Sequence, residues 1–215
     1  MESFDPREPR SGLLPPQHTL MRVVHARDAA MRARVHAAHR LNRGAQNRWR
    51  RLPNFPRPRS ALAMTAVQAG GASFLVACGG IRLPGGISDE VDIFDTRKGA
   101  WVAGPALLGE RSGAAAASID FKVYMMGGVS TSGALAGVDV LDLRTLTWER
   151  DLTDAMKQPR TSLAAVTCGE RIVAIGGYDE SGLPVDTVEL YEPSVGWSEG
   201  RSLSFARGLL GAALY

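Results

Sequence analysis

Short apolar runs separated by Gly- and Pro-rich turns recur through residues 60–215 and predict β-strands. Runs of small residues lie at 60–67, 112–119 and 161–168. Almost wholly apolar runs ending in a Gly-Gly pair lie at 73–80, 122–128 and 171–177. Alternating segments lie at 91–95, 138–142 and 188–192. A Trp-bearing segment follows each of these, so the pattern predicts units of four short strands.

The second run of each unit has the composition of a strand covered on both faces. The third run places Asp92, Asp139 or Glu189 between apolar neighbours, which predicts a strand nearer to solvent. The small residues of the first run fit an inner strand, where neighbouring sheets converge and large side chains would collide. A Trp offers a large apolar area for packing between neighbouring sheets.

Three kinds of marker repeat with the same period, close to 49 residues. The four Trp residues are Trp49, Trp101, Trp148 and Trp197. The Gly-Gly pairs are at 79–80, 127–128 and 176–177. The arginines in phase with them are Arg59, Arg111, Arg160 and Arg207. Four antiparallel strands repeated radially make a β-propeller, so the predicted fold is all-β.

The Gly-Gly pair, an acidic residue about six positions before the Trp and an Arg about ten after it resemble the kelch family. The resemblance covers about residues 47–215 and implies a kelch-type β-propeller. It predicts complete four-stranded blades in units 59–110, 111–159 and 160–206. Segments 47–58 and 207–215 resemble the last and the first strand of two further, partial blades.

Three blades and two single strands fall short of the four to eight blades that a propeller usually has. We expect a fragment of a larger kelch protein. The alternatives are a ring closed by self-assembly with another copy or with a partner, and a stable open arc.

The charge divides the chain into two unlike parts. Residues 1–59 carry 13 Arg and 4 Asp or Glu, a net charge of +9, whereas residues 60–215 carry 12 Lys or Arg and 18 Asp or Glu, a net charge of −6. We therefore predict a basic N-terminal arm, 1–46, before a propeller, 47–215, whose acidic excess lies in residues 60–215. The Pro-rich start predicts disorder, and residues 19–43, which lack Gly and Pro, predict a basic helix.

All four histidines lie in this arm, and no cysteine or carboxylate pair near them favours a metal site over a solvated helix face. The arginines of the arm could bind nucleic acid or an acidic partner. Nucleic acid is disfavoured because no aromatic residues are interleaved to stack on bases. The sequence shows neither an apolar run long enough for a transmembrane helix nor a signal peptide, and two cysteines fit a reduced, cytoplasmic protein.

The propeller region offers no catalytic constellation. Residues 49–215 contain no histidine, which removes serine and cysteine triads and the histidine ligands that copper-dependent kelch oxidases need. No cofactor and no metal are therefore expected. The resemblance implies a non-enzymatic protein–protein interaction module, such as a substrate-recognition unit of a ubiquitin ligase or a cytoskeletal scaffold. The alternatives are a kelch-fold enzyme of the sugar epimerase or oxidase type, and binding of nucleic acid or an acidic partner through the arm.

Five residues are candidates for partner binding. Arg111, Arg160 and Arg207 recur in phase and could form a ring of guanidinium groups that grips an acidic peptide. The alternative is a structural role, in which each hydrogen-bonds the loop backbone. Arg82 and Asp179 lie in the variable loops 81–90 and 178–186, where a repeated scaffold usually carries its specificity.

Overall fold

The computed structural model describes residues 51–151 and 155–214. The chain divides into two units, Met1–Arg51 and Leu52–Tyr215, and almost all described residues belong to the second. The basic arm 1–46 and its predicted helix at 19–43 lie outside the described residues. No helix in the described part of the chain is long and apolar enough to cross a membrane.

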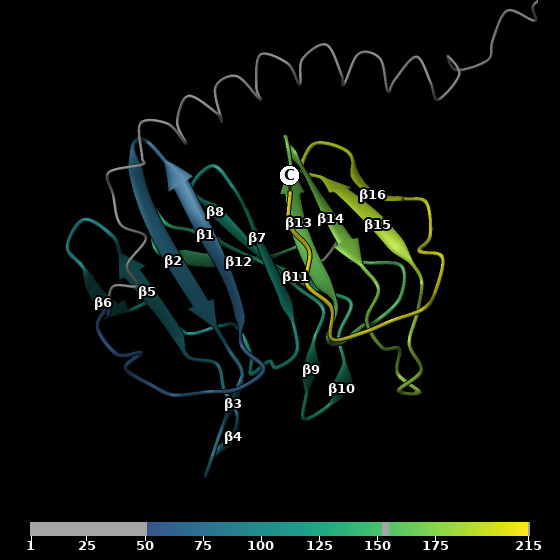
Figure 1. Ribbon diagram of the computed structural model, residues 1–215, viewed down its shortest axis with the longest axis horizontal. Coiled ribbons are helices and arrows are strands. Elements are labelled where there is room, and N and C mark those ends of the chain that lie inside the picture. The colour runs from purple at the N-terminus through teal and green to yellow at the C-terminus, as the bar shows by residue number, and fades with distance from the viewer. Residues whose placement is uncertain (1–50, 152–154, 215) are drawn as a thin grey trace, which may run out of the picture. The chain divides into compact units, whose positions relative to one another are not determined.

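Three four-stranded antiparallel sheets make up the second unit (Figure 1). Sheet 1 contains β1 (Ala63–Ala69), β2 (Ala72–Cys78), β5 (Val91–Asp95) and β6 (Ala100–Ala103). Sheet 2 contains β7 (Ala115–Ile119), β8 (Lys122–Met126), β11 (Val138–Asp142) and β12 (Thr147–Asp151). Sheet 3 contains β13 (Ala164–Cys168), β14 (Arg171–Ile175), β15 (Val188–Glu192) and β16 (Gly196–Glu199). The strands of each sheet pair in chain order, which confirms the predicted all-β units of four strands.

Two short hairpins interrupt the long loops between the second and third strands. They pair β3 (Ile81–Arg82) with β4 (Gly86–Ile87), and β9 (Val129–Ser130) with β10 (Gly133–Ala134). The hairpins project from one edge of the sheets, at the bottom of Figure 1. The linkers 104–111, 155–160 and 200–207, which join or follow the sheets, run along the same edge because each fourth strand ends there. We call this the loop edge.

The inner strands β1, β7 and β13 lie side by side, and two hydrophobic cores separate the three sheets (Figure 1). The inner strand of sheet 2 has alanine at 115, 116 and 117, each at most 9% exposed. These small side chains let adjacent sheets approach, as predicted. Trp148 packs against the core between sheets 1 and 2, and its Nε1 donates to the backbone oxygen of Pro105, 3.0 Å away.

The Gly-Gly pairs fix the spacing between successive sheets. In the second pair, Gly127 has φ of +63°, and a Cβ there would lie 2.5 Å from the backbone oxygen of Arg160. The N–H of Gly128 donates to the same oxygen, 2.7 Å away. Only glycine combines this backbone conformation with so close an approach. The pair therefore places the backbone of the arginine that begins the next unit.

A chain of backbone hydrogen bonds also links the units along their inner ends. The linked positions are Ala61, Gly113, Ser162 and Leu209, which all have φ between +51° and +61°. The N–H groups of Gly113, Ser162 and Leu209 each donate to the carbonyl oxygen of the preceding position in this series, over 2.6–2.9 Å. The left-handed backbone conformation thus recurs at this equivalent position of each unit.

The two predicted single strands form no ladder in the described residues. Residues 51–58 and 207–214 contain no strand. The partial strands predicted at 47–58 and 207–215 are therefore corrected wherever the structure describes them. The first segment contains Pro53, Pro56 and Pro58, which have no N–H to donate, and neither segment has a neighbouring strand to complete a sheet.

Candidate functional site

Each four-stranded sheet contains an ion pair between one of the repeating arginines and the acidic residue of its third strand. Each arginine precedes a sheet, and each carboxylate lies on the third strand of that sheet. The pairs and their N–O distances are Arg59–Asp92 at 2.8 Å, Arg111–Asp139 at 2.8 Å and Arg160–Glu189 at 2.7 Å. The phase shared by the arginines and the acids in the sequence thus has a direct physical meaning.

The pairs lie in the interior. Asp92, Asp139 and Glu189 are 1%, 0% and 0% exposed, so the prediction that they lie nearer to solvent is wrong. The alternation of the third strand misled because the polar positions face a guanidinium group and not water. A buried carboxylate with a charge partner and hydrogen bonds avoids most of the penalty of burial.

Burial also changes the proposal of an arginine rim. Arg111 is 3% exposed and Arg160 is 0% exposed, so neither guanidinium group is open to a partner peptide. Arg160 donates to the backbone oxygens of Gly176 and Thr187, both 3.0 Å away, besides its ion pair. These bonds fit the structural alternative, in which the arginine holds loop backbone. Among the three arginines, only Arg207 remains exposed for the proposed role.

Desolvation acts on these buried guanidinium groups. Burial lowers the pKa of Arg160, and the nearby Glu189 carboxylate acts in the opposite direction. Burial likewise lowers the pKa of Arg111, opposed first by Asp139. The carboxylates thus favour the charged form that burial disfavours, which makes each member of a pair dependent on the other.

The remaining predicted residues lie apart on the loop edge. Arg82 forms an ion pair with Glu90 at 2.9 Å, and its side chain is 49% exposed. The carboxylate of Asp179 accepts from the backbone N–H groups of Ser181 and Leu183, both at 2.9 Å, and so shapes its own turn. No hydrogen bond or ion pair joins Arg82, Asp179 and Arg207 in the part of the chain that the structure describes.

A cavity of about 400 Å³ opens on the loop edge between the linker that follows sheet 1 and the β9–β10 hairpin. Glu110, Thr131 and Arg150 line it, and none of them was predicted. The Thr131 N–H donates to Glu110 at 3.2 Å, while Arg150 donates to Asp139 at 2.9 Å. Only the position of 129–137 among the variable loops could have indicated this wall in the sequence.

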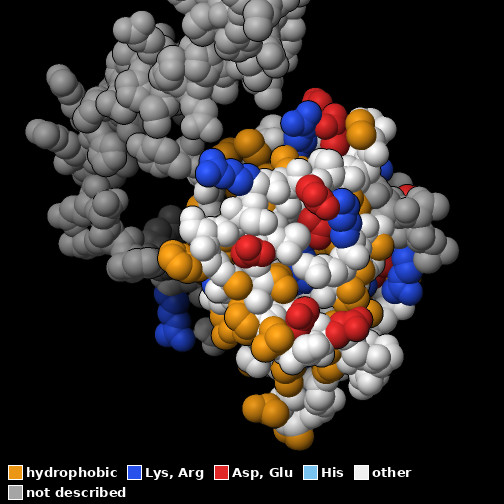
Figure 2. Space-filling view, turned by 90° about the vertical axis from the view of Figure 1, so that its right-hand side faces the viewer, with side chains coloured by type: hydrophobic (Ala, Val, Ile, Leu, Met, Phe, Trp, Pro, Cys, Tyr) orange, Lys and Arg blue, Asp and Glu red, His pale blue; other side chains and the backbone are white. Residues whose placement is uncertain are grey.

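Exposed leucines mark the tips of two of the three long loops. Leu83 is 91% exposed and Leu183 is 62% exposed, and each precedes a proline. Figure 2 shows hydrophobic surface at the lower end of the molecule, where the loop edge lies. Exposed apolar side chains beside a mixed polar cavity are typical of a surface that binds another protein.

The described residues hold no cluster of metal-ligating side chains, and their two cysteines differ in exposure. In residues 51–151 and 155–214, no three His, Cys, Asp or Glu side chains gather closely enough to hold a metal ion. Cys78 is buried in the core, and Cys168 is exposed. Burial raises the pKa of the Cys78 thiol to about 12, which keeps it protonated and unreactive.

Comparisons with known proteins agree with this geometry. The family model described as "Kelch motif" matches residues 110–150 and 159–202. The chain is 35% identical over 113 residues to the F-box/kelch-repeat protein At4g39560 of Arabidopsis thaliana, covering 47% of this chain and 42% of that protein. It is 42% identical over 62 residues to the F-box/kelch-repeat protein At2g44630 of the same plant, covering 29% and 16%. The chain thus spans less than half the length of these curated relatives.

A solved structure described as "Structure of YjhT" is similar to the fold. Its TM-score is 0.60 at 16% sequence identity, and the match covers 73% of this chain and 56% of that one. At this identity the likeness concerns the fold alone, and it supports the assignment of the three sheets as blades of a propeller.

Proposed function

Because this chain is built from kelch repeats, we propose that it is a non-enzymatic module that binds another protein through its loop edge. The observation that carries the proposal is a contrast between the residues that repeat in every unit and the loops that differ between units. The phased arginines and acids hold the sheets internally, whereas the loops that differ between units project outward. Variable loops on a rigid repeated scaffold are where such proteins usually carry specificity.

The two F-box/kelch relatives favour a more specific role. Their names combine a kelch repeat with an F-box, and we propose that this chain acts as the substrate-recognition part of a ubiquitin ligase. The recognised substrate would be a protein segment that contacts the loop-tip leucines and the cavity beside β9–β10. We place this activity in the cytoplasm, where both thiols would stay reduced.

Substitution of the two loop-tip leucines tests the proposal. The full chain, tagged and used as bait in an extract, is compared with the double variant Leu83→Asp and Leu183→Asp by quantitative mass spectrometry. Both side chains are exposed, so the variant should keep its fold and its unfolding midpoint. We expect the partners of the loop edge to be lost, because buried carboxylates at an interface core oppose binding.

Val195→Asp is the matched control. Val195 is 77% exposed and lies in the turn between β15 and β16, at the opposite edge of sheet 3 from the loops. It replaces an exposed apolar side chain by a carboxylate, as each leucine substitution does, without touching the loop edge. Partners that survive the leucine substitutions but not Val195→Asp would contradict the assignment of the loop edge.

A further inference from the structure

Arg207 has the same backbone environment as the arginines that begin sheets 2 and 3. The N–H groups of Arg111, Arg160 and Arg207 donate to carbonyl oxygens of the preceding long loop, each over 3.1 Å. Their own carbonyl oxygens accept from the second glycine of the preceding pair, over 2.7–2.9 Å. Sheet 3 therefore places residue 207 as sheets 1 and 2 place the arginines that follow them.

The side chain of Arg207 breaks the series. Arg59, Arg111 and Arg160 each bind a carboxylate on the third strand of the sheet that follows them. Arg207 is exposed. Within residues 51–151 and 155–214, its guanidinium group donates only one long hydrogen bond, of 3.4 Å, to the backbone oxygen of Phe205. An arginine held at this station thus lacks the acid that its equivalents use.

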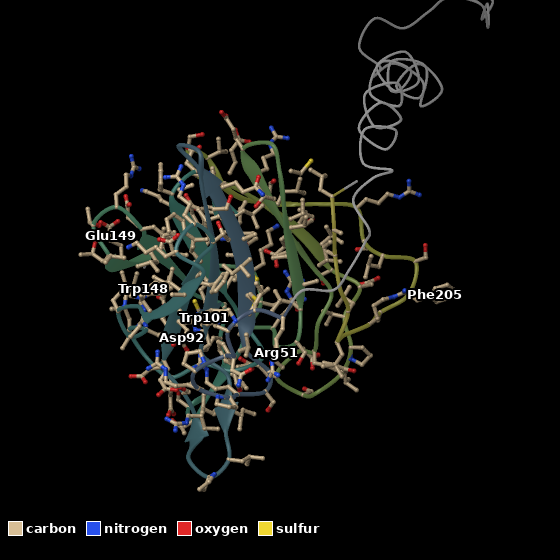
Figure 3. All side chains as sticks on the ribbon, turned by 60° about the vertical axis from the view of Figure 1, so that its left-hand side comes forward. Arg51, Asp92, Trp101, Trp148, Glu149 and Phe205 are labelled. Carbon is tan, nitrogen blue, oxygen red and sulfur yellow. The ribbon has the colours of Figure 1, made fainter. Side chains whose placement is uncertain are left out.

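Exposed apolar residues flank this arginine in the chain. Phe205 is 73% exposed and Leu209 is 81% exposed, and Figure 3 shows Phe205 projecting from the body of the molecule. The residues in phase with Leu209 are the smaller Ala61, Gly113 and Ser162. A guanidinium group between large exposed apolar side chains is typical of a surface that another protein covers.

A partner that binds at this surface must present a carboxylate that is free to pair with Arg207. A second copy of this chain would present sheet 1, whose Asp92 is 1% exposed and already accepts from Arg57 and Arg59 of its own chain. That acid is therefore satisfied, and a second copy does not complete the charge of Arg207. The complementary partner is a sheet whose third strand carries an acid without an arginine of its own.

We propose that the surface formed by Phe205, Arg207 and Leu209, in the segment that follows sheet 3, docks a four-stranded antiparallel β-sheet of a partner protein, whose third strand presents an Asp or Glu carboxylate to Arg207. This surface does not include the loop-tip leucines Leu83 and Leu183, so it adds a second interaction of the loop edge to the proposed function.

A graft supplies a sheet of known sequence as the probe. Arg207–Tyr215 corresponds in phase to Arg160–Cys168, so a second copy of residues 169–206 is appended directly after Tyr215 of the full chain. The appended sheet then carries a copy of the Glu189 carboxylate. Urea unfolding is measured for four extended chains, which carry Arg207 or Arg207→Met together with Glu or Gln at the appended acidic position. The unextended chain is measured with and without Arg207→Met.

We expect Arg207→Met to lower the urea midpoint of the extended chain clearly and to leave the midpoint of the unextended chain unchanged. With Gln at the appended position, the effect of Arg207→Met should largely vanish, because the ion pair is already lost. Equal effects of Arg207→Met on both appended forms would overturn the proposal. An appended segment that remains sensitive to protease would also overturn it, since the face would then not accept a matching sheet.

Light scattering of the unmodified chain tests whether a second copy of this chain binds at the surface instead. We expect a monomer at micromolar concentration, both for the chain and for Arg207→Asp. A dimer that Arg207→Asp dissociates would assign the face to a second copy and reject the acidic partner sheet.

Discussion

Replacing Arg160 by methionine tests the internal role of the phased arginines. The Arg160 and Glu189 side chains are both 0% exposed, and their ion pair spans 2.7 Å. After Arg160→Met, the Glu189 carboxylate keeps only the Lys157 N–H, at 2.9 Å, among its described hydrogen bonds. Removing one partner of a buried ion pair costs about 3–5 kcal/mol, because the other charge stays buried without it. In a domain of this size, that loss lowers Tm by about 6–20 °C.

Arg207→Met is the matched control, because Arg207 has the same station in the repeat and an exposed side chain without a carboxylate in the described residues. Its cost should stay within about 0.5 kcal/mol. Urea unfolding followed by Trp fluorescence gives both values, with the slope m as a check on two-state behaviour. The double variant Arg160→Met and Glu189→Leu should recover part of the loss, because no charge is then left unpaired. Equal costs for Arg160→Met and Arg207→Met would refute the structural role.

Three further predictions concern the sheets themselves. Gly127→Ala should cost at least about 2 kcal/mol in urea unfolding, because a Cβ would lie 2.5 Å from a backbone oxygen at φ +63°, whereas Gly137→Ala, with nothing within 4 Å, should be nearly neutral; similar losses would contradict this. DTNB at pH 8.5 should label Cys168 in the native chain and Cys78 only after unfolding. Burial raises the pKa of Cys78 in the folded state to about 12, so the contribution of this thiol to the free energy of unfolding should be intact below about pH 9 and lost as the pH rises toward 12. Phe55→Ala should cost about 1–2 kcal/mol by thermal unfolding, since its ring packs edge-on against the Trp of sheet 1, and an unchanged Tm would refute that packing role.

The sequence carried enough information to predict the three sheets. The third strands 91–95, 138–142 and 188–192 have the predicted bounds, and the Gly-Gly pairs end just beyond the second strands. These features are local, because apolar periodicity and glycine conformation follow from neighbouring residues. The single strands at 47–58 and 207–215 failed because a ladder depends on a partner strand that the pattern of one segment does not supply.

The candidate site was harder to predict than the sheets. Asp92, Asp139 and Glu189 were interpreted as solvent-facing, although each is enclosed with an arginine from more than 25 positions away in the chain. Such a pair can be read from the sequence only by linking the two periods to each other. The cavity wall formed by Glu110, Thr131 and Arg150 has no repeated signature at all, because it arises where one linker meets one hairpin.

The hydrogen-bond chain through Ala61, Gly113, Ser162 and Leu209 has a consequence for how such a protein changes over generations. The joint between units uses peptide groups, which every residue except proline carries in full, so it tolerates four different side chains. A duplication or deletion of one whole unit therefore leaves these backbone hydrogen bonds available to the units that become neighbours. The number of sheets can change in integer steps by recombination, while the projecting loops diversify independently.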